Sequence, residues 1–229
     1  MGSVFRRLLR FWSQENSLSA LLAILVIRLF VMIPTLGGGL LVVMTSDTIL
    51  YLILLVGLCT MLRSKSLMVL FSACVVLGAI AHNAWLLLDL PLLADWDFAF
   101  SAFAILGTLM VTLRMVYQDG PVTAHRIRGA VAAYLLLGAL FAKTYAIINY
   151  LVPGAFNVPA ALIQYYGKTG EAFYYFSIVT LTTVGFGDIT AVTPVARSFV
   201  MVEALVGQLY PAILIARLVS LAVADNMKG

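Results

Sequence analysis

The sequence predicts an all-α membrane protein, on the evidence of its hydrophobicity, the length of its apolar runs and the pattern within them. Hydrophobic residues make up 63% of the 229 residues and charged residues only 10%, which is more apolar side chain than a water-soluble domain could cover. Peptide groups find no water in hydrocarbon, so a spanning segment must be a helix or part of a closed barrel. The two-residue alternation of barrel strands is absent from the sequence. Helices are therefore expected.

Six apolar runs are expected to cross the membrane as helices. About 20 residues cover roughly 30 Å of hydrocarbon, and the runs lie at residues 18–36, 48–62, 67–88, 98–117, 129–151 and 197–219. A further stretch at 171–182 is too short to cross, so we expect a re-entrant helix there. The Gly120–Pro121 turn pair separates a four-helix block at 17–120, preceded by an interfacial helix at 1–16, from a second unit at 121–229.

Basic residues gather on one side of these helices if both termini are cytoplasmic. Among the basic residues in the loops and at the helix ends, only Lys168 and Arg197 fall on the other side. Cytoplasmic loops of membrane proteins carry the excess of Lys and Arg. We therefore expect a multi-pass protein surrounded by membrane lipids in the cell membrane, plasma or inner. The net charge of +4 reports this topology and gives no support to nucleic-acid binding. The acidic residues expected on the outer side are Asp47, Asp89, Asp95, Asp97, Glu171 and Asp188.

The stretch TVGFGD, residues 183–188, is polar and glycine-rich although it lies between two very hydrophobic stretches. Irregular backbone at membrane depth is tolerated only where it lines water or is buried in protein. Glycine reaches backbone angles that other residues resist, so Gly185 and Gly187 can help to turn successive carbonyls to one side. A column of carbonyl oxygens can replace the hydration shell of a cation. The negative end of the preceding helix dipole and the carboxyl of Asp188 also favour a cation.

Two adjoining stretches, YYFSIVTLTTVGFGDIT and ARSFVMVEALVGQLYPAILIARLV, resemble the pore module of tetrameric potassium channels. The similarity is specific over residues 172–218, and the whole chain looks like a bacterial six-helix member of that superfamily. It implies a homotetramer of voltage-gated-like ion channel architecture with a pore domain at 121–229. This domain would hold an outer helix at 129–151, a pore helix at 171–182 and an inner helix at 197–219. The selectivity filter would consist of Thr183, Val184, Gly185, Phe186 and Gly187, with K⁺ bound at the first four.

The resemblance also assigns roles below the filter. Thr182 and Gln208 would lie near the upper wall of a cavity. Gly207 falls where the family places a gating hinge. Pro211, one turn further along, should kink the inner helix because proline removes a backbone hydrogen bond. A bend without a gating role is the alternative for Pro211.

The filter departs from the family pattern in its aromatic support. Phe186 replaces the usual tyrosine and Phe176 the frequent pore-helix tryptophan, so we expect apolar Phe-on-Phe packing without a directed hydrogen bond. Tyr175 remains available to donate to Asp188. Val179 stands where some relatives carry a carboxylate that pairs with the filter aspartate, so that coupling is missing. The filter is therefore expected to be held differently from that of the best-known members.

Several ionisable side chains fall inside predicted spans, where such groups are costly and default to functional candidates with a partner. Glu203 could pair with Lys143, or could bond to the end of the pore helix behind the filter. Arg28 is either a packing anchor or part of a lipid or ligand pocket. His82 is expected to be a hydrogen-bonded residue of the core or interface, although histidine titrates near neutral pH.

The fourth predicted helix, 98–117, contains a single arginine, Arg114. Moving one charge through 100 mV supplies only about 2.3 kcal/mol, so steep voltage gating is not expected. The sequence thus predicts a voltage-independent, potassium-selective channel, without enzymatic activity and without a cofactor beyond permeant K⁺. A weakly selective cation channel and a non-conducting regulatory subunit of another channel are the alternatives.

Overall fold

The computed structural model describes residues 17–32, 51, 65–88, 91–118, 122–166 and 169–226. Several expectations lie outside these residues: the interfacial helix at 1–16, all of the run at 48–62 except Tyr51, the Gly120–Pro121 turn, and the outer-side positions of Asp47, Asp89 and Lys168. The described part of the chain is mostly helical. Its helices are α2 (Ser17–Ile27), the π-helical turn η1 (Arg28–Met32), α5 (Lys65–Leu88), α6 (Pro91–Tyr117), α7 (Ala124–Leu151), α8 (Ala160–Tyr166), α9 (Thr169–Leu181) and α10 (Pro194–Asn226).

Within the described residues, three helices are long and apolar enough to cross a membrane. They are Trp96–Tyr117, Ala124–Leu151 and Pro194–Leu221. Two shorter apolar helical stretches, Leu18–Val31 and Ser72–Ala84, fall in the first and third predicted runs. The composition and these helices together indicate a membrane protein.

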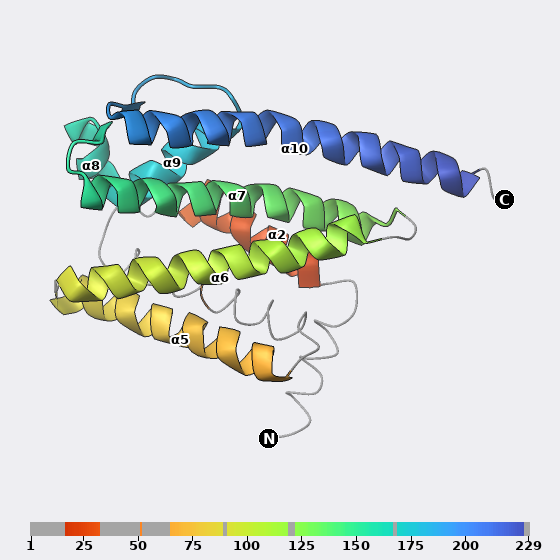
Figure 1. The fold of residues 1–229 in the computed structure, drawn as a ribbon, viewed down its shortest axis with the longest axis horizontal. Coiled ribbons are helices and arrows are strands. Elements are labelled where there is room, and N and C mark those ends of the chain that lie inside the picture. Colours follow the sequence, from red (N-terminus) through yellow and green to blue (C-terminus); the bar gives the residue numbers. More distant parts are fainter. Residues whose placement is uncertain are drawn as a thin grey trace.

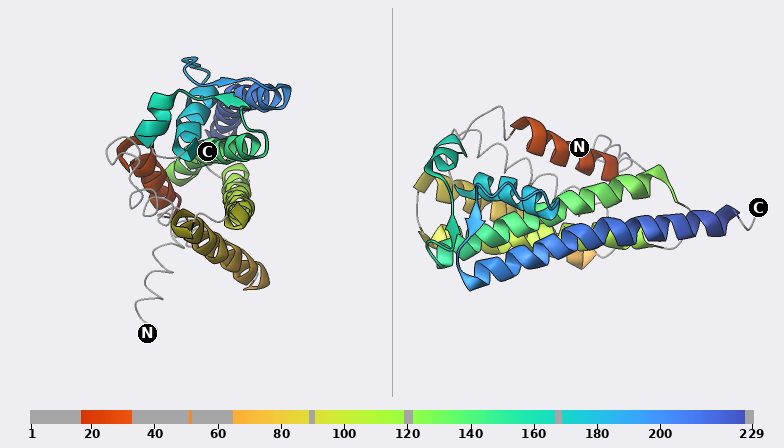
Figure 2. Two further views of the ribbon diagram at one scale, coloured as in Figure 1. Left: turned by 90° about the vertical axis from the view of Figure 1, so that its left-hand side faces the viewer. Right: turned by 90° about the horizontal axis from the view of Figure 1, so that it is seen from above.

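The long helices α5, α6, α7 and α10 lie in a row in chain order, each packed against the next (Figure 1). α2 packs on α7, and α9 packs against both α7 and α10 at one end of the row. The far end of α10 extends beyond the other helices (Figure 2). The chain thus builds a layer of peripheral helices, α2, α5 and α6, on one side of α7, and places α9 and α10 on another.

The helix α7 holds these groups together because small residues line its buried faces. Gly129, Ala132, Ala133, Gly138 and Ala139 are all buried. Small side chains let helix backbones approach closely, which is the usual packing device within membranes. A Cβ on Gly129 would meet Leu18 of α2, and one on Gly138 would meet Ile178 of α9.

The two-stranded pairing of β1 (Phe156–Asn157) with β2 (Thr190–Ala191) ties the segments on either side of α9. The strands are antiparallel, with Phe156 opposite Ala191. The sequence predicted only an outer loop between α7 and α9, whereas this loop holds β1 and the short helix α8. The pairing brings the segment that follows residues 183–188 back to the end of α7.

The fourth predicted helix starts earlier than expected. The sequence suggested a loop up to Asp97, but α6 begins at Pro91, and proline is a favoured first residue of a helix because its missing N–H is not needed there. Asp97 is only 1% exposed, so its carboxyl does not contact solvent, and the side of the membrane on which it lies stays a prediction. A charged residue in a sequence usually indicates solvent exposure, but this carboxyl is buried among partners from three other segments.

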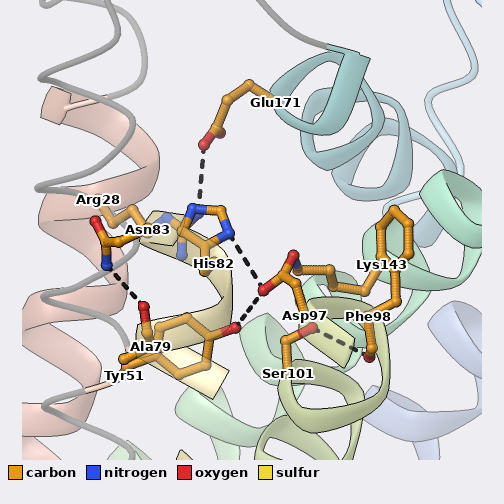
Figure 3. A network of polar contacts seen from close by, with 10 residues as sticks. All are labelled: Arg28, Tyr51, Ala79, His82, Asn83, Asp97, Phe98, Ser101, Lys143 and Glu171. Carbon is orange, nitrogen blue, oxygen red and sulfur yellow. Dashed lines mark hydrogen bonds and ion pairs between the residues drawn. The ribbon is translucent and has the colours of Figure 1, made fainter. Parts of the chain in front are cut away.

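Those partners form a buried polar cluster between the peripheral helices and α7 (Figure 3). Tyr51 Oη donates to Asp97 Oδ1 at 2.8 Å, and Lys143 Nζ of α7 donates to Oδ2 at 3.2 Å. His82 Nδ1 of α5 lies 3.2 Å from Oδ1. His82 is therefore a buried core residue, as expected. The proposed pairing of Lys143 with Glu203 is wrong, because Lys143 binds Asp97.

Two arginines bind the carbonyls that the end of α6 leaves without helical partners. Arg126 of α7 donates to Val116 O at 2.8 Å and also contacts Gln118 O. Arg217 of α10 donates to Tyr117 O at 2.6 Å, and its guanidinium carbon lies 5.1 Å from the centre of the Tyr117 ring. The end of α6 is thus fixed to both α7 and α10.

Replacing Lys143 by glutamine should destabilise the protein. The Asp97 carboxyl would lose its charged partner while staying buried, and breaking a buried pair in this way costs roughly 3 kcal/mol or more. Denaturant unfolding of the detergent-solubilised protein measures the loss. The control is Arg128→Gln, which removes an exposed bond from Arg128 Nη1 to Ser19 Oγ and should cost about 0.5 kcal/mol or less. Equal stabilities of the two variants would contradict the prediction.

Candidate functional site

The candidate site is built on α9, a 13-residue helix between α7 and α10. At 1.5 Å per residue α9 is about 20 Å long, which is less than the roughly 30 Å of a bilayer core. It ends at Leu181, close to the expected end at 182, and the TVGFGD stretch follows directly. Glu171 lies in its first turn and pairs with Arg28 of η1, with Arg28 Nη2 3.4 Å from Glu171 Oε1; the expectation that Glu171 lies on the outer side of the membrane stays a prediction.

The segment after α9 is bonded back to the last helical turn. Thr182 N donates to Ile178 O at 3.0 Å. Val184 N and Gly185 N both donate to Val179 O, at 3.0 and 3.3 Å. These bonds satisfy the first N–H groups of an irregular segment and the carbonyls at the helix end. Residues 182–185 therefore begin from a fixed position at the C-terminal end of α9.

The backbone of residues 183–187 alternates in the sign of φ. Thr183, Gly185 and Gly187 have φ of +60°, +57° and +79°, and Val184 and Phe186 do not have positive φ. Such alternation turns consecutive peptide planes so that their carbonyls can point to the same side. Glycine adopts positive φ without a steric cost, which explains its place at two of the three positions. Thr183 is the only positive-φ residue with a side chain in the described part of the chain.

In a single copy of the chain, the side chains of this segment are exposed. Val184 is 55% and Phe186 is 69% exposed, and Thr182 is exposed as well. The expected packing of Phe186 on Phe176 is not formed within the chain. Phe176 instead contacts Tyr145 and Phe156, with ring centroids 5.3 and 5.8 Å away.

The end of the segment is held by Asp188. Tyr175 Oη donates to Asp188 Oδ2 at 2.8 Å, as the sequence suggested, and Asp188 Oδ1 accepts from Ile189 N at 3.0 Å. From here the chain enters β2, and Val192 N donates to Ala155 O at 2.9 Å. Both ends of residues 183–187 are therefore anchored, one to α9 and one to the β1–β2 pair.

Behind α9 lies a buried carboxyl, that of Glu203 on α10, which is 0% exposed. The hydroxyls of Tyr145 on α7 and Ser177 on α9 both bond to it. Ser177 Oγ also lies 2.7 Å from Gly138 O of α7. Of the two sequence-based alternatives for Glu203, the bond to the end of the helix preceding TVGFGD is the nearer one, because Glu203 bonds to Ser177, four residues before that helix ends at Leu181. One carboxyl links the three helices α7, α9 and α10.

Gly207 marks the closest approach between α9 and α10. A Cβ on Gly207 would overlap the Leu181 backbone, with the Leu181 carbonyl carbon at 2.7 Å. Tyr134 Oη of α7 donates to Leu181 O at 2.9 Å and lies 3.4 Å from Gly207 O. The absence of a side chain at Gly207 thus lets the end of α9 pack closely against α10. The adjacent Gln208 is exposed, and α10 continues as one helix through Pro211 to Asn226.

The arrangement offers oxygen atoms rather than a metal-binding side-chain cluster. No group of three or more His, Cys, Asp or Glu that could hold a metal ion occurs among the described residues. The carbonyls of residues 183–187 and the hydroxyl of Thr183 are oxygen donors of the type that alkali cations prefer. The site is therefore suited to a cation that is held by backbone oxygens.

Sequence reasoning missed three hydroxyl groups of this site, those of Tyr134, Tyr145 and Ser177. A signal was present, because Tyr134 and Tyr145 lie in an apolar run and buried tyrosine hydroxyls find hydrogen-bond partners. The partners themselves, Leu181 O and Glu203, lie 47 and 58 residues away along the chain, so no local pattern pointed to them.

Adding a methyl group at Gly207 should destabilise the joint between α9 and α10. Gly207→Ala places its Cβ against backbone, and overpacking of this kind costs about 1–3 kcal/mol. Gly138→Ala is the matched control, because its Cβ would meet side-chain atoms rather than backbone, with the movable Ile178 Cδ1 at 2.7 Å and Leu181 Cδ2 at 3.7 Å. Thermal unfolding in detergent compares the two. A loss in Gly207→Ala no larger than in Gly138→Ala would contradict the close approach.

A protein-family model described as an ion channel matches residues 131–224 of this chain. The match runs from within α7 to the last turn of α10, and so includes α9, residues 182–188, Glu203 and Gly207. Comparisons with curated proteins and with solved structures gave no match. Residues 131–224 are therefore similar to an ion channel domain, and the helices that can cross a membrane agree with a channel function.

Proposed function

We propose that four copies of this chain form a potassium-selective channel, in which the carbonyls of residues 183–186 and the Thr183 hydroxyl bind dehydrated K⁺. The observation that carries this proposal is the alternating φ of residues 183–187 at the end of α9, within an ion channel domain. Rings of carbonyl oxygens replace the hydration shell of K⁺ in potassium-selective filters. The partial negative charge at the C-terminal end of α9 adds to the preference for a cation.

The proposal of a tetramer rests on the single TVGFGD stretch that each chain contributes. Each chain has one TVGFGD stretch, and a ring of oxygens around an ion needs several copies arranged about an axis. The exposure of the apolar side chains Val184 and Phe186 in the single chain supports their contact with neighbouring copies. The exposure of Thr182 and Gln208 in the single chain supports their proposed position in a cavity beneath the filter.

The fourth predicted helix carries little charge that a membrane voltage could move. Arg114 is the one arginine of the fourth predicted helix and is exposed near the end of α6. The proposed channel is therefore voltage-independent and passive, with K⁺ as its only required ion. It works in the cell membrane with both termini cytoplasmic.

One observation favours a weakly selective cation channel as the second candidate. Phe176 packs on Tyr145 and Phe156 rather than on Phe186, so the filter lacks an aromatic brace within its own subunit. Its carbonyls would then be free to adapt to ions of other sizes.

Reconstitution of the purified chain tests the function and separates the candidates. In liposomes with a K⁺ gradient, the proposal expects flux that Ba²⁺ blocks, and in planar bilayers a reversal potential near that of K⁺ when Na⁺ faces K⁺. A reversal potential near zero would indicate the weakly selective channel. No flux from a chain that is tetrameric by light scattering would overturn the proposal in favour of a regulatory subunit.

Replacing Gly185 by alanine should abolish most of the K⁺ flux. Positive φ costs a residue with a Cβ about 1–2 kcal/mol, so the filter conformation would become roughly tenfold less favourable per subunit. Gly154→Ala is the matched control, because Gly154 also has positive φ, +83°, without a neighbour within 4 Å of a Cβ, and lies outside the filter. Flux assays of both variants decide. A loss of flux in Gly154→Ala as large as that in Gly185→Ala would contradict the filter assignment.

Removing the Tyr145 hydroxyl should weaken selectivity as well as stability. Tyr145→Phe leaves the Glu203 carboxyl with an unsatisfied oxygen, at a cost of about 1–3 kcal/mol, and loosens α9 behind the filter. Reversal potentials should show a lower K⁺ to Na⁺ permeability ratio. Tyr150→Phe, exposed on the same helix, should leave the ratio unchanged. An unaltered ratio in Tyr145→Phe would show that the Glu203 cluster does not support the filter.

A further inference from the structure

The first turn of α9 is held by a residue that the proposed function leaves unused. Arg28 is the first residue of the π-helical turn η1 and is only 7% exposed. Its Nη2 lies 3.4 Å from Glu171 Oε1, and its guanidinium carbon lies 5.4 Å from the centre of the Tyr174 ring. An arginine within an apolar helix is costly unless it meets such partners, and π-helical turns are frequent at functional sites.

Glu171 and Tyr174 are three residues apart on α9 and therefore lie on the same face of the helix. Arg28 binds the first through charge and the second through its aromatic ring, so it grips one face of the first turns of α9. Arg28, His82, Asp97, Lys143 and Glu171 lie in one neighbourhood (Figure 3). The contact joins the segment at 17–32 directly to the helix that precedes the filter.

The contact of Arg28 with Tyr174 can affect the filter segment because of the residue that follows Tyr174. Tyr175 follows Tyr174 and donates to Asp188 Oδ2 at 2.8 Å, at the far end of the filter segment. A change in the tilt or rotation of the first turns of α9 would move the Tyr175 hydroxyl relative to Asp188. The other end of α9 is fixed by Tyr134 and Gly207, so movement at the first turn cannot be absorbed by sliding of the whole helix.

We propose that Arg28 is a positioning residue for the selectivity filter, and that the first helix acts on conduction through the Arg28–Glu171 contact on α9. This proposal rests on the proposed function, that the chain conducts ions through residues 183–187. It assigns the peripheral helices a role that does not need voltage, because their effect reaches the filter by way of Glu171, Tyr174 and Tyr175. It also accounts for an arginine placed within an apolar run.

The test uses the full chain reconstituted in planar bilayers, with Arg28→Gln, Glu171→Gln and the exchange variant Arg28→Glu with Glu171→Arg. Each neutralisation should lower the open probability by about fivefold or more, the effect of a coupling of about 1 kcal/mol between two sites, and should change the K⁺ to Rb⁺ permeability ratio. The exchange variant should restore at least part of both. Arg128→Gln is the control, because Arg128 also contacts the first helix, through Ser19, but does not contact α9.

Two results would overturn the proposal: open probability and permeability ratio unchanged in Arg28→Gln, or the same changes in Arg128→Gln. Should Arg28→Gln fail to assemble, Arg28→Lys and Glu171→Gln decide, since lysine keeps the charge and should stay close to the wild type while Glu171→Gln should not. Amide hydrogen exchange of residues 169–188, measured by mass spectrometry, should rise in Arg28→Gln and not in Arg128→Gln.

The exchange measurement separates failure of this proposal from failure of the proposed function. If the wild-type chain carries no K⁺, the proposed function fails. Faster exchange in Arg28→Gln would then still support the grip of Arg28 on α9. If the wild-type chain conducts K⁺ and exchange and currents are unchanged in Arg28→Gln, only the role of Arg28 fails.

Discussion

The structure depends on how an irregular segment is held between apolar helices. Residues 182–188 form neither a helix nor a strand, and peptide groups without partners are costly away from water. The chain meets this constraint at both ends of the segment. Val179 O receives two N–H groups at the start, and the Tyr175 bond to Asp188 holds the end. With its ends fixed, the short stretch between them can keep a backbone with alternating φ.

Hydroxyl and carboxyl groups make the connections between helices that apolar packing alone would leave loose. Within a membrane the surrounding lipid is as apolar as a leucine side chain, so hydrogen bonds and close backbone contact carry much of the specificity of helix association. Glu203 joins α7, α9 and α10 through Tyr145 and Ser177. Tyr134 and Gly207 fix the end of α9. These groups explain why α9, a short helix, has a defined position.

The peripheral helices are connected to α7, α9 and α10 by three charged side chains. Arg217 of α10 binds the end of α6, Lys143 of α7 binds Asp97 of α6, and Arg28 of η1 binds Glu171 of α9. Each connection uses one charged side chain from one group of helices and an acceptor from the other. A movement of the peripheral helices would therefore displace groups bonded to α10, to α7 and to the first turn of α9.

The sequence by itself determined that this is a mostly helical membrane protein, and it indicated where irregular backbone interrupts the helices. Apolar run length and composition predicted helices, since every residue of a long apolar run contributes to the signal. The boundaries of α5 and α9 fall within two residues of expectation, whereas α7 begins five residues earlier and α10 ends seven residues later than expected. The glycines of TVGFGD indicated positive φ because few other residues adopt it. The φ of Thr183 was not predicted, because threonine has no such preference.

Only the tertiary structure decided the partners of the buried charges. The sequence did not give the partners of Asp97, Glu171 and Lys143, because a charged residue can indicate either solvent exposure or a buried partner. Tyr51 and Lys143 lie 46 residues from Asp97, and Arg28 lies 143 residues from Glu171. The close contact at Gly207 could also be identified only from the structure, since a glycine that allows close approach and one that allows bending look alike in sequence. Contacts between distant residues are set by how helices pack, and a single sequence carries no local record of that packing.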